Sequence, residues 1–167
     1  MSDFSSCIPL LARFLQQRNE LLSTAESCTG GLIGHLLTNE AGSSAWYLGG
    51  VVSYSNSLKT GMLEVGRDII AEHGAVSSQC VLAMAAGVLK LTGSHAGIAV
   101  SGIAGPDGGT PEKPVGTVFM AWGAGSDFWW EKHFFQGNRM EIKTLAAFRA
   151  IQGLLGYYQN IRRKDSA

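Results

Sequence analysis

The sequence has few charged residues, and those present leave no net charge. Charged side chains make up 16% of the 167 residues, with 13 basic and 13 acidic residues in balance. Nucleic acids attract proteins that carry a positive surplus, so this balance gives no support for a nucleic-acid partner. The basic residues cluster only in the tail Arg162-Arg163-Lys164. We therefore expect a protein that binds no nucleic acid.

Long apolar segments are also missing. No apolar run approaches the roughly 18 residues that a membrane span requires, and the N-terminus lacks the basic-then-apolar pattern of a secretion signal. We therefore expect a cytoplasmic protein with no membrane partner. No low-complexity tract interrupts the chain, and a hydrophobic content of 46% suffices for a sizeable core. The prediction is one globular domain over residues 1–167.

Cysteine and histidine are too sparse to indicate a metal centre. Cys7, Cys28 and Cys80 are odd in number and far apart, and no pair has a metal-binding spacing. The four histidines are scattered as well. These patterns argue against a disulfide framework and against a zinc site. We therefore expect no bound metal ion.

Apolar periodicity predicts helices that alternate with short strands. Strands are expected at residues 21–25, 46–54, 96–101, 115–122 and 127–136, the last two as a hairpin. One helix is expected to begin at about Ile8, and a second is expected over residues 27–38. Two more are expected between Arg67 and Thr92, separated at Gly74, the second of them with a Ser77 or Ser78 cap. A terminal helix is expected after an Asn138 cap, with Glu141 three residues further on. This order predicts an α/β fold, namely a three-layer α/β/α sandwich whose mixed sheet has helices on both faces. Ligands of such folds bind beyond the strand ends.

The stretch Thr24–Gly31, which reads Thr-Ala-Glu-Ser-Cys-Thr-Gly-Gly, places Ser27 where a strand should give way to a helix. The first N–H groups of a helix are unpaired and its dipole is positive there, so an oxyanion or phosphate is stabilised nearby. Serine is also an ordinary helix cap, which contributes roughly 1 kcal/mol. Glu26 beside it is expected to position a lysine or a water, or simply to be paired.

Two further unusual segments follow later strands. The first is Tyr54-Ser55-Asn56-Ser57-Leu58-Lys59, and the second is Ser101–Thr117, which begins Ser101-Gly102-Ile103-Ala104-Gly105-Pro106-Asp107-Gly108-Gly109. Glycines let backbone N–H groups turn toward an anion or a flat ring, although such loops are often plain turns. The spacing matches neither a nucleotide-hydrolysing loop nor a dinucleotide fingerprint, so ATP and NAD are not indicated.

In this order the three segments resemble the CinA family, specifically its C-terminal domain, from about Thr24 to Arg139. Active members of that family are nicotinamide mononucleotide (NMN) deamidases. The resemblance implies an amidohydrolase that converts NMN and water to nicotinate mononucleotide and ammonia and needs no cofactor. Two alternatives remain open at this point, namely a paralogue that binds the nucleotide without hydrolysing it, and an assembly partner that docks another protein.

The resemblance implies three catalytic residues. Ser27 would attack the amide carbon, Lys59 would accept the serine proton, and Tyr54 would assist. A solvated lysine is protonated at neutral pH, so Lys59 must be desolvated to act as a base. Without the flanking motif it would read as a surface lysine. Cys28 is the alternative nucleophile, but as the next residue of a helix it would point away.

The resemblance also implies a substrate-binding set. Backbone N–H groups around Cys28 to Gly30 would hold the oxyanion, and Arg139 would bind the substrate phosphate in a bidentate manner. The full set is Cys28, Thr29, Gly30, Gly31, Gly102, Ile103, Ala104, Gly105, Thr110 and Arg139.

An aromatic strand closes the list of features. Phe128, Trp129, Trp130, Phe134 and Phe135 alternate sides, so one face can enter the core while the other needs a cover. We therefore expect a homo-oligomer, with a dimer as the simplest form.

Overall fold

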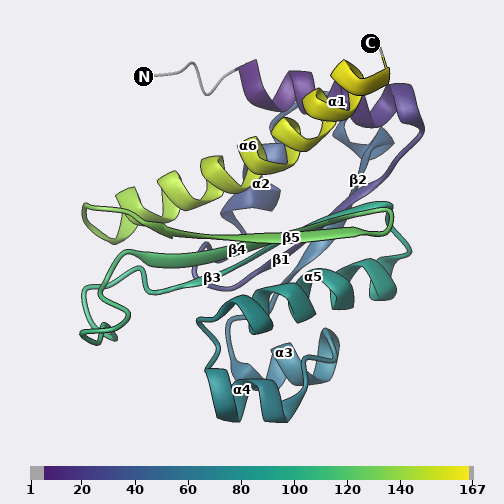
Figure 1. The fold of residues 1–167 in the computed structure, drawn as a ribbon. Coiled ribbons are helices and arrows are strands. Elements are labelled where there is room, and N and C mark those ends of the chain that lie inside the picture. Colours follow the sequence, from purple (N-terminus) through teal and green to yellow (C-terminus); the bar gives the residue numbers. More distant parts are fainter. Residues whose placement is uncertain (1–5, 166–167) are drawn as a thin grey trace.

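In the computed structural model, which describes residues 6–165, five strands form one sheet between two layers of helices (Figure 1). The strands are β1 (Leu22–Glu26), β2 (Tyr47–Val52), β3 (Ala96–Gly102), β4 (Thr117–Ala124) and β5 (Asp127–Phe134). The helices are α1 (Cys7–Arg18), α2 (Leu32–Thr38), α3 (Asn56–Met62), α4 (Arg67–His73), α5 (Ser78–Thr92) and α6 (Arg139–Asp165), with a 3-10 turn at Ser43–Ala45. The predicted α/β/α sandwich is confirmed.

The sheet is mixed, as predicted, with the strand order β2-β1-β3-β4-β5. β1 runs parallel to both β2 and β3, whereas β4 is antiparallel to β3 and to β5. The carboxyl ends of β1, β2 and β3 therefore meet at one edge of the sheet. The chain leaves this edge at Ser27, at Ser53 and at Ile103, and these three exits position the candidate site.

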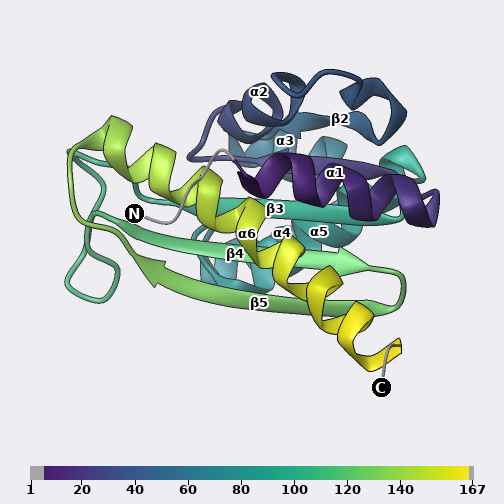
Figure 2. The same ribbon diagram turned by 90° about the horizontal axis from the view of Figure 1, so that it is seen from above.

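Each face of the sheet has its own core. α1, α2 and α6 cover one face, and α3, α4 and α5 lie on the other (Figures 1 and 2). Side chains alternate along β3, so Ile98 and Val100 join the core under α1 and α6, while Ala99 joins the core against α5. The small alanine lets α5 approach the sheet closely. α5 in turn carries Gly87, where an added Cβ would lie 2.0 Å from the Leu63 carbonyl oxygen, so α5 fixes the segment after α3.

Several predicted helix boundaries are confirmed. α4 ends at His73 before Gly74, and the Ser77 hydroxyl caps α5 by accepting the Cys80 N–H at 3.2 Å. At the start of α6 the Asn138 side chain accepts the Glu141 N–H at 3.1 Å, while the Glu141 carboxylate accepts the Asn138 N–H at 2.7 Å. This reciprocal pair is the capping box expected from the spacing.

The predicted start of α2 at Ser27 is wrong, because α2 begins at Leu32. Gly30 and Gly31 have φ angles of 63° and 94°, a left-handed conformation that no helix continues. Ser27 therefore lies in a loop and is not a helix cap. The turn of the last hairpin is also shorter than expected, because β4 extends to Ala124 and only Gly125 and Ser126 connect it to β5.

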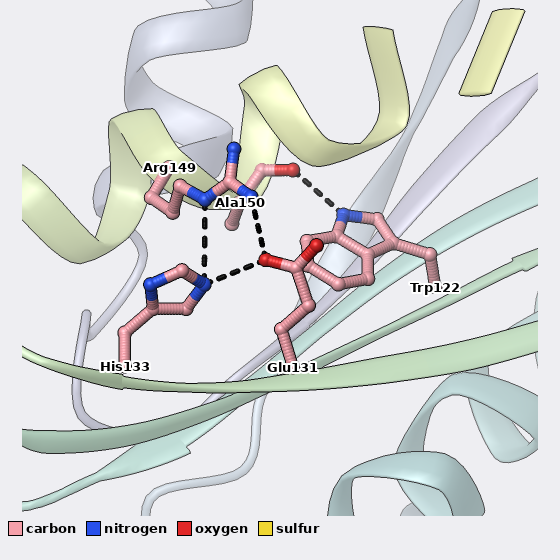
Figure 3. A network of polar contacts seen from close by, with 5 residues as sticks. All are labelled: Trp122, Glu131, His133, Arg149 and Ala150. Atoms are coloured by element: carbon pink, nitrogen blue, oxygen red, sulfur yellow. Dashed lines mark hydrogen bonds and ion pairs between the residues drawn. The ribbon is translucent and has the colours of Figure 1, made fainter. Parts of the chain in front are cut away.

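One face of the edge strand β5 is tied to α6 by a polar network (Figure 3). The Arg149 guanidinium donates to the Glu131 carboxylate at 2.6 Å, and its Nε lies 3.3 Å from His133 Nε2. Partial burial alone would raise the pKa of Glu131, but hydrogen bonds from His133 and Arg149 outweigh it and hold that pKa below its ordinary value. Beside this network the Trp122 indole donates to the Ala150 carbonyl at 2.7 Å.

The other face of β5 exposes Phe128, Trp130 and Phe134, so the predicted alternation is confirmed. What covers this face stays a prediction. Among the helices of residues 6–165, none combines the length and the apolar character that a membrane crossing needs.

Candidate active site

A polar cavity of about 320 Å³ opens at the edge where β1, β2 and β3 end. Its walls come from the loops after these strands and from the first residue of α6. The lining residues are Ser27, Cys28, Tyr54, Gly102, Ile103, Ala104, Gly105, Asp107, Gly108 and Arg139. Six of the ten residues predicted to bind substrate therefore lie in the walls, together with two of the three predicted catalytic residues.

The third predicted catalytic residue, Lys59, lies behind Ser27. Its Nζ is 2.9 Å from Ser27 Oγ. Both residues are buried, with Lys59 1% and Ser27 8% exposed to solvent. Ser27 is held by its own N–H, which donates to the Val100 carbonyl at 3.0 Å and so extends the pairing of β1 with β3. Lys59 comes from α3, a short helix that begins at a Ser55 cap. The fold thus brings together two side chains that are 32 residues apart.

The surroundings of Lys59 Nζ can accommodate a neutral amine as well as an ammonium group. Two carbonyl oxygens lie near it, Ser53 O at 2.6 Å and Tyr54 O at 3.4 Å, and both can only accept. A neutral amine has two N–H donors and one lone pair, so it can donate to both carbonyls and accept the Ser27 hydroxyl proton. Among the side chains that the structure describes, no carboxylate forms an ion pair with Lys59.

Burial lowers the pKa of Lys59 below its ordinary value of 10.5, because the charged form loses its hydration. The thiols of Cys80 and Cys28 act weakly in the opposite direction. A lysine with a lowered pKa and a hydroxyl within hydrogen-bond distance is the arrangement by which a serine is activated without histidine.

The neighbouring thiol of Cys28 is less suited to nucleophilic attack than the Ser27 hydroxyl in this geometry. Cys28 is buried, and burial raises the pKa of its thiol to about 12, so the reactive thiolate is absent at neutral pH. The hydroxyl of Ser27, in contrast, contacts the amine of Lys59 directly.

Glu26 has a structural partner that the sequence did not reveal. Its Oε2 accepts the N–H groups of Gly31 and Ile33 at 3.0 Å each, and its Oε1 accepts that of Gly34 at 2.8 Å. Thr29 donates its hydroxyl to the same carboxylate at 2.7 Å. The positive end of α2 is therefore occupied by the Glu26 carboxylate, so the N–H groups of Gly31, Ile33 and Gly34 are not free to bind an oxyanion. Of the alternatives expected for Glu26, the structure shows simple pairing.

The residues after Cys28 shape the loop instead of lining the cavity. Thr29 and Gly31 are taken up by the Glu26 carboxylate, and the Gly30 N–H donates to the Ser27 carbonyl at 3.1 Å. Thr110 also lies away from the cavity, because its exposed hydroxyl accepts the Lys113 N–H at 3.1 Å within the glycine-rich loop.

Tyr54 and Arg139 meet at the mouth of the cavity. The Tyr54 side chain is 61% exposed, and its hydroxyl accepts a hydrogen bond from Arg139 Nη2 at 3.1 Å. Arg139 Nη1 donates to the Gly105 carbonyl at 2.6 Å. The Tyr54 hydroxyl thus positions the arginine, while the Tyr54 backbone carbonyl contacts Lys59.

Asp107 and Gly108 line the cavity but were absent from the predicted set. They belong to the glycine-rich segment that stands out in the sequence, but their Pro-Asp-Gly sequence is also typical of a plain turn, so the pattern did not single out these two residues. Gly105 is required for packing, because it has a φ of 78° and an added Cβ would lie 2.5 Å from Val115. Among the described residues, no three His, Cys, Asp or Glu side chains gather in a way that could hold a metal ion.

A larger hollow of about 540 Å³ lies nearby on α6, lined by Gln136, Gly137, Met140, Glu141, Thr144 and Leu145. The Thr144 hydroxyl in its walls donates to the Met140 carbonyl at 2.8 Å, and the Glu141 carboxylate caps α6, so neither group is paired with the other as nucleophile and base. The cavity at Ser27 is therefore the candidate active site.

Comparison with known proteins is consistent across the chain. Residues 6–158 match the family model described as the CinA C-terminal domain. The nicotinamide-nucleotide amidohydrolase PncC of Pseudomonas putida is 43% identical over 155 residues, which cover 93% of this chain and 97% of that protein. A CinA-like protein of Geotalea uraniireducens is 47% identical over 145 residues, but these cover only 34% of its length. The chain thus spans about a third of the length of such CinA-like relatives.

Solved structures show the same fold. A CinA superfamily protein from Klebsiella pneumoniae has a TM-score of 0.91 and 35% identity, covering 95% of this chain and 99% of that chain. A competence/damage inducible protein from Agrobacterium tumefaciens has a TM-score of 0.84 and 41% identity, covering 93% and 98%.

Proposed function

The chain belongs to the CinA C-terminal domain family, and we propose that it is an amidohydrolase that converts NMN and water to nicotinate mononucleotide and ammonia. The observation that carries the proposal is the buried contact between Lys59 Nζ and Ser27 Oγ. The similarity to the amidohydrolase PncC, which covers nearly the full length of both chains, supports the choice of substrate.

The first chemical step joins Ser27 to the substrate. Neutral Lys59 takes the proton of the Ser27 hydroxyl, and Oγ attacks the carboxamide carbon of the nicotinamide ring. The carbonyl oxygen becomes an oxyanion, which needs N–H donors placed in advance. The Gly30 N–H is already bonded to the Ser27 carbonyl, and Cys28 is the residue after Ser27 that lines the cavity, so we assign the oxyanion to the N–H group of Cys28.

The second step releases ammonia and regenerates the serine. Lys59, now charged, gives its proton to the departing nitrogen as the carbon–nitrogen bond breaks, which leaves an ester on Ser27. Water then attacks the ester carbon while Lys59 again takes a proton, and that proton returns to Ser27 Oγ as nicotinate mononucleotide leaves.

Arg139 would hold the phosphate of the substrate. Two of its five N–H groups are used by Gly105 O and the Tyr54 hydroxyl, so the guanidinium is fixed in place with three donors to spare. Such a pre-oriented guanidinium suits bidentate contact with a phosphate.

Ammonia release from NMN by the purified chain tests the proposal. We expect turnover by the wild type, and loss of turnover in Ser27→Ala and in Lys59→Ala. Lys90→Ala is the matched control. Lys90 is an exposed lysine on α5 that pairs with Glu64, so its substitution should leave the rate unchanged. An inert wild type that is nonetheless stabilised by NMN would overturn hydrolysis in favour of a nucleotide-binding protein. Full activity of Ser27→Ala would overturn the assignment of the nucleophile.

A further inference from the structure

A second cation stands one helical turn beyond Arg139. Lys143 is four residues further along α6, and side chains at this spacing lie on the same helix face, with Cβ atoms roughly 5–6 Å apart. α6 packs against α2 across one face of the sheet (Figure 2). Lys143 therefore lies toward the loop that runs from Ser27 to the start of α2.

The Lys143 ammonium lies close to Gly30. An added Cβ at Gly30 would lie 3.5 Å from Lys143 Nζ. Apart from Gly30 and its two neighbours in the chain, no other residue that the structure describes has a heavy atom within 4 Å of that Cβ. The charge also acts on the cavity wall, because Lys143 is one of two lysines that lower the pKa of the Cys28 thiol against the larger effect of burial. The ammonium thus lies beside the loop that carries the nucleophile.

Lys143 has no partner of its own among the described residues. No hydrogen bond or ion pair joins its Nζ to another of these groups. Glu141, two residues before it on α6, is occupied in capping that helix, and Glu26 is occupied at the start of α2. Lys143 is half-buried, and its charge is not compensated by a neighbouring acidic group in the described part of the chain. Such a lysine beside a cavity is suited to bind an anion.

We propose that Lys143 binds the substrate phosphate together with Arg139, so that the dianion lies between the first two turns of α6 and the Cys28–Gly30 loop. This inference rests on the proposed function for the identity of the substrate. A phosphate monoester carries roughly −1.5 to −2 charges at neutral pH, so one guanidinium leaves it incompletely neutralised. The Lys143 ammonium supplies the second positive charge, from a residue that no sequence motif singled out.

Binding of ribose 5-phosphate, measured by titration calorimetry, tests the proposal without relying on turnover. We compare the wild type with Lys143→Gln, Lys143→Arg and the control Lys90→Gln. Loss of a charge-assisted contact should weaken binding by Lys143→Gln roughly tenfold to a hundredfold. Lys143→Arg should restore most of the affinity, and Lys90→Gln should match the wild type.

Steady-state kinetics add a second readout. For Lys143→Gln we expect a higher KM for NMN with little change in kcat, and a far smaller change for nicotinamide riboside, which lacks the phosphate. Equal losses on both substrates, or a Kd for ribose 5-phosphate within twofold of the wild type, would overturn the phosphate role. A wild type that binds ribose 5-phosphate through Lys143 but releases no ammonia would leave the phosphate site standing and remove the proposed reaction.

Discussion

Lys59 Nζ lies closer to the Ser53 carbonyl oxygen, at 2.6 Å, than to the Ser27 hydroxyl, at 2.9 Å. Ser53 is the residue directly after β2, and its own N–H donates to the Glu26 carbonyl at 2.8 Å. The backbone that orients the lysine is therefore an extension of the same sheet that orients the serine. This arrangement fixes Lys59, the proposed base, relative to Ser27, the proposed nucleophile, without help from an acidic side chain.

The pH dependence of the reaction should follow the protonation state of Lys59. The base must be neutral, and burial lowers the pKa of Lys59 below 10.5, so kcat/KM should rise with pH through that lowered value and level off above it. Activity should be lost as the pH falls, because protonation removes the lone pair that accepts the Ser27 proton. A rate profile from pH 5 to pH 10 measures this.

Lys59→Arg is the sharp control for that profile. An arginine keeps the positive charge but does not lose its proton at any pH of the experiment, so the variant should be inactive throughout. A variant that keeps wild-type activity, or a wild-type rate that falls as the pH rises, would contradict the role of Lys59 as a base.

Thiol alkylation and substitution should show whether Cys28 or Ser27 is the nucleophile. Burial raises the pKa of the Cys28 thiol to about 12, so it should resist alkylation at pH 7 and react only after unfolding. Cys28→Ala should therefore retain activity within a few-fold, whereas Ser27→Ala should lose on the order of 10³-fold or more. Ammonia release and mass spectrometry of alkylated protein check both statements. Rapid labelling of native Cys28 with parallel loss of activity would point to the thiol as nucleophile.

Much of the fold could be predicted because its signals are local. Hydrophobic runs of strand length, the Gly74 break and the Asn138 cap depend on neighbours within a few residues, and all three agree with the structure. The start of α2 could not be predicted in this way. Its N–H groups are bound by Glu26, a strand residue whose side chain reaches past the Ser27 loop, and no local pattern distinguishes it from a solvated carboxylate.

The candidate site was predictable only in part, for the same reason. Ser27 and the glycine-rich loop stand out in the sequence, but the contact of Arg139 with Tyr54 joins residues 85 positions apart. Lys143 belongs to no motif, and its proximity to the site follows from the fold alone, while Asp107 lies within the glycine-rich loop without a signal of its own. The expected homodimer stays a prediction, which sedimentation equilibrium would test.

Glu26 should matter for stability as well as for catalysis. Its buried carboxylate accepts three backbone N–H groups and the Thr29 hydroxyl, so Glu26→Ala leaves these donors unpaired and should lower the free energy of unfolding by about 3 kcal/mol or more. Glu26→Gln preserves the shape but replaces one acceptor by a donor, and we expect a smaller loss.

Urea unfolding of Glu26→Gln, beside Glu72→Gln as an exposed control on α4, measures the effect. The Ser27 loop is anchored through the same carboxylate, so kcat of Glu26→Gln should fall even at temperatures where the variant is fully folded. KM should change less, because Arg139 reaches the cavity from α6 and does not depend on α2. An unchanged kcat in a destabilised Glu26→Gln would show that the loop keeps its shape without the carboxylate and that Glu26 serves the fold alone.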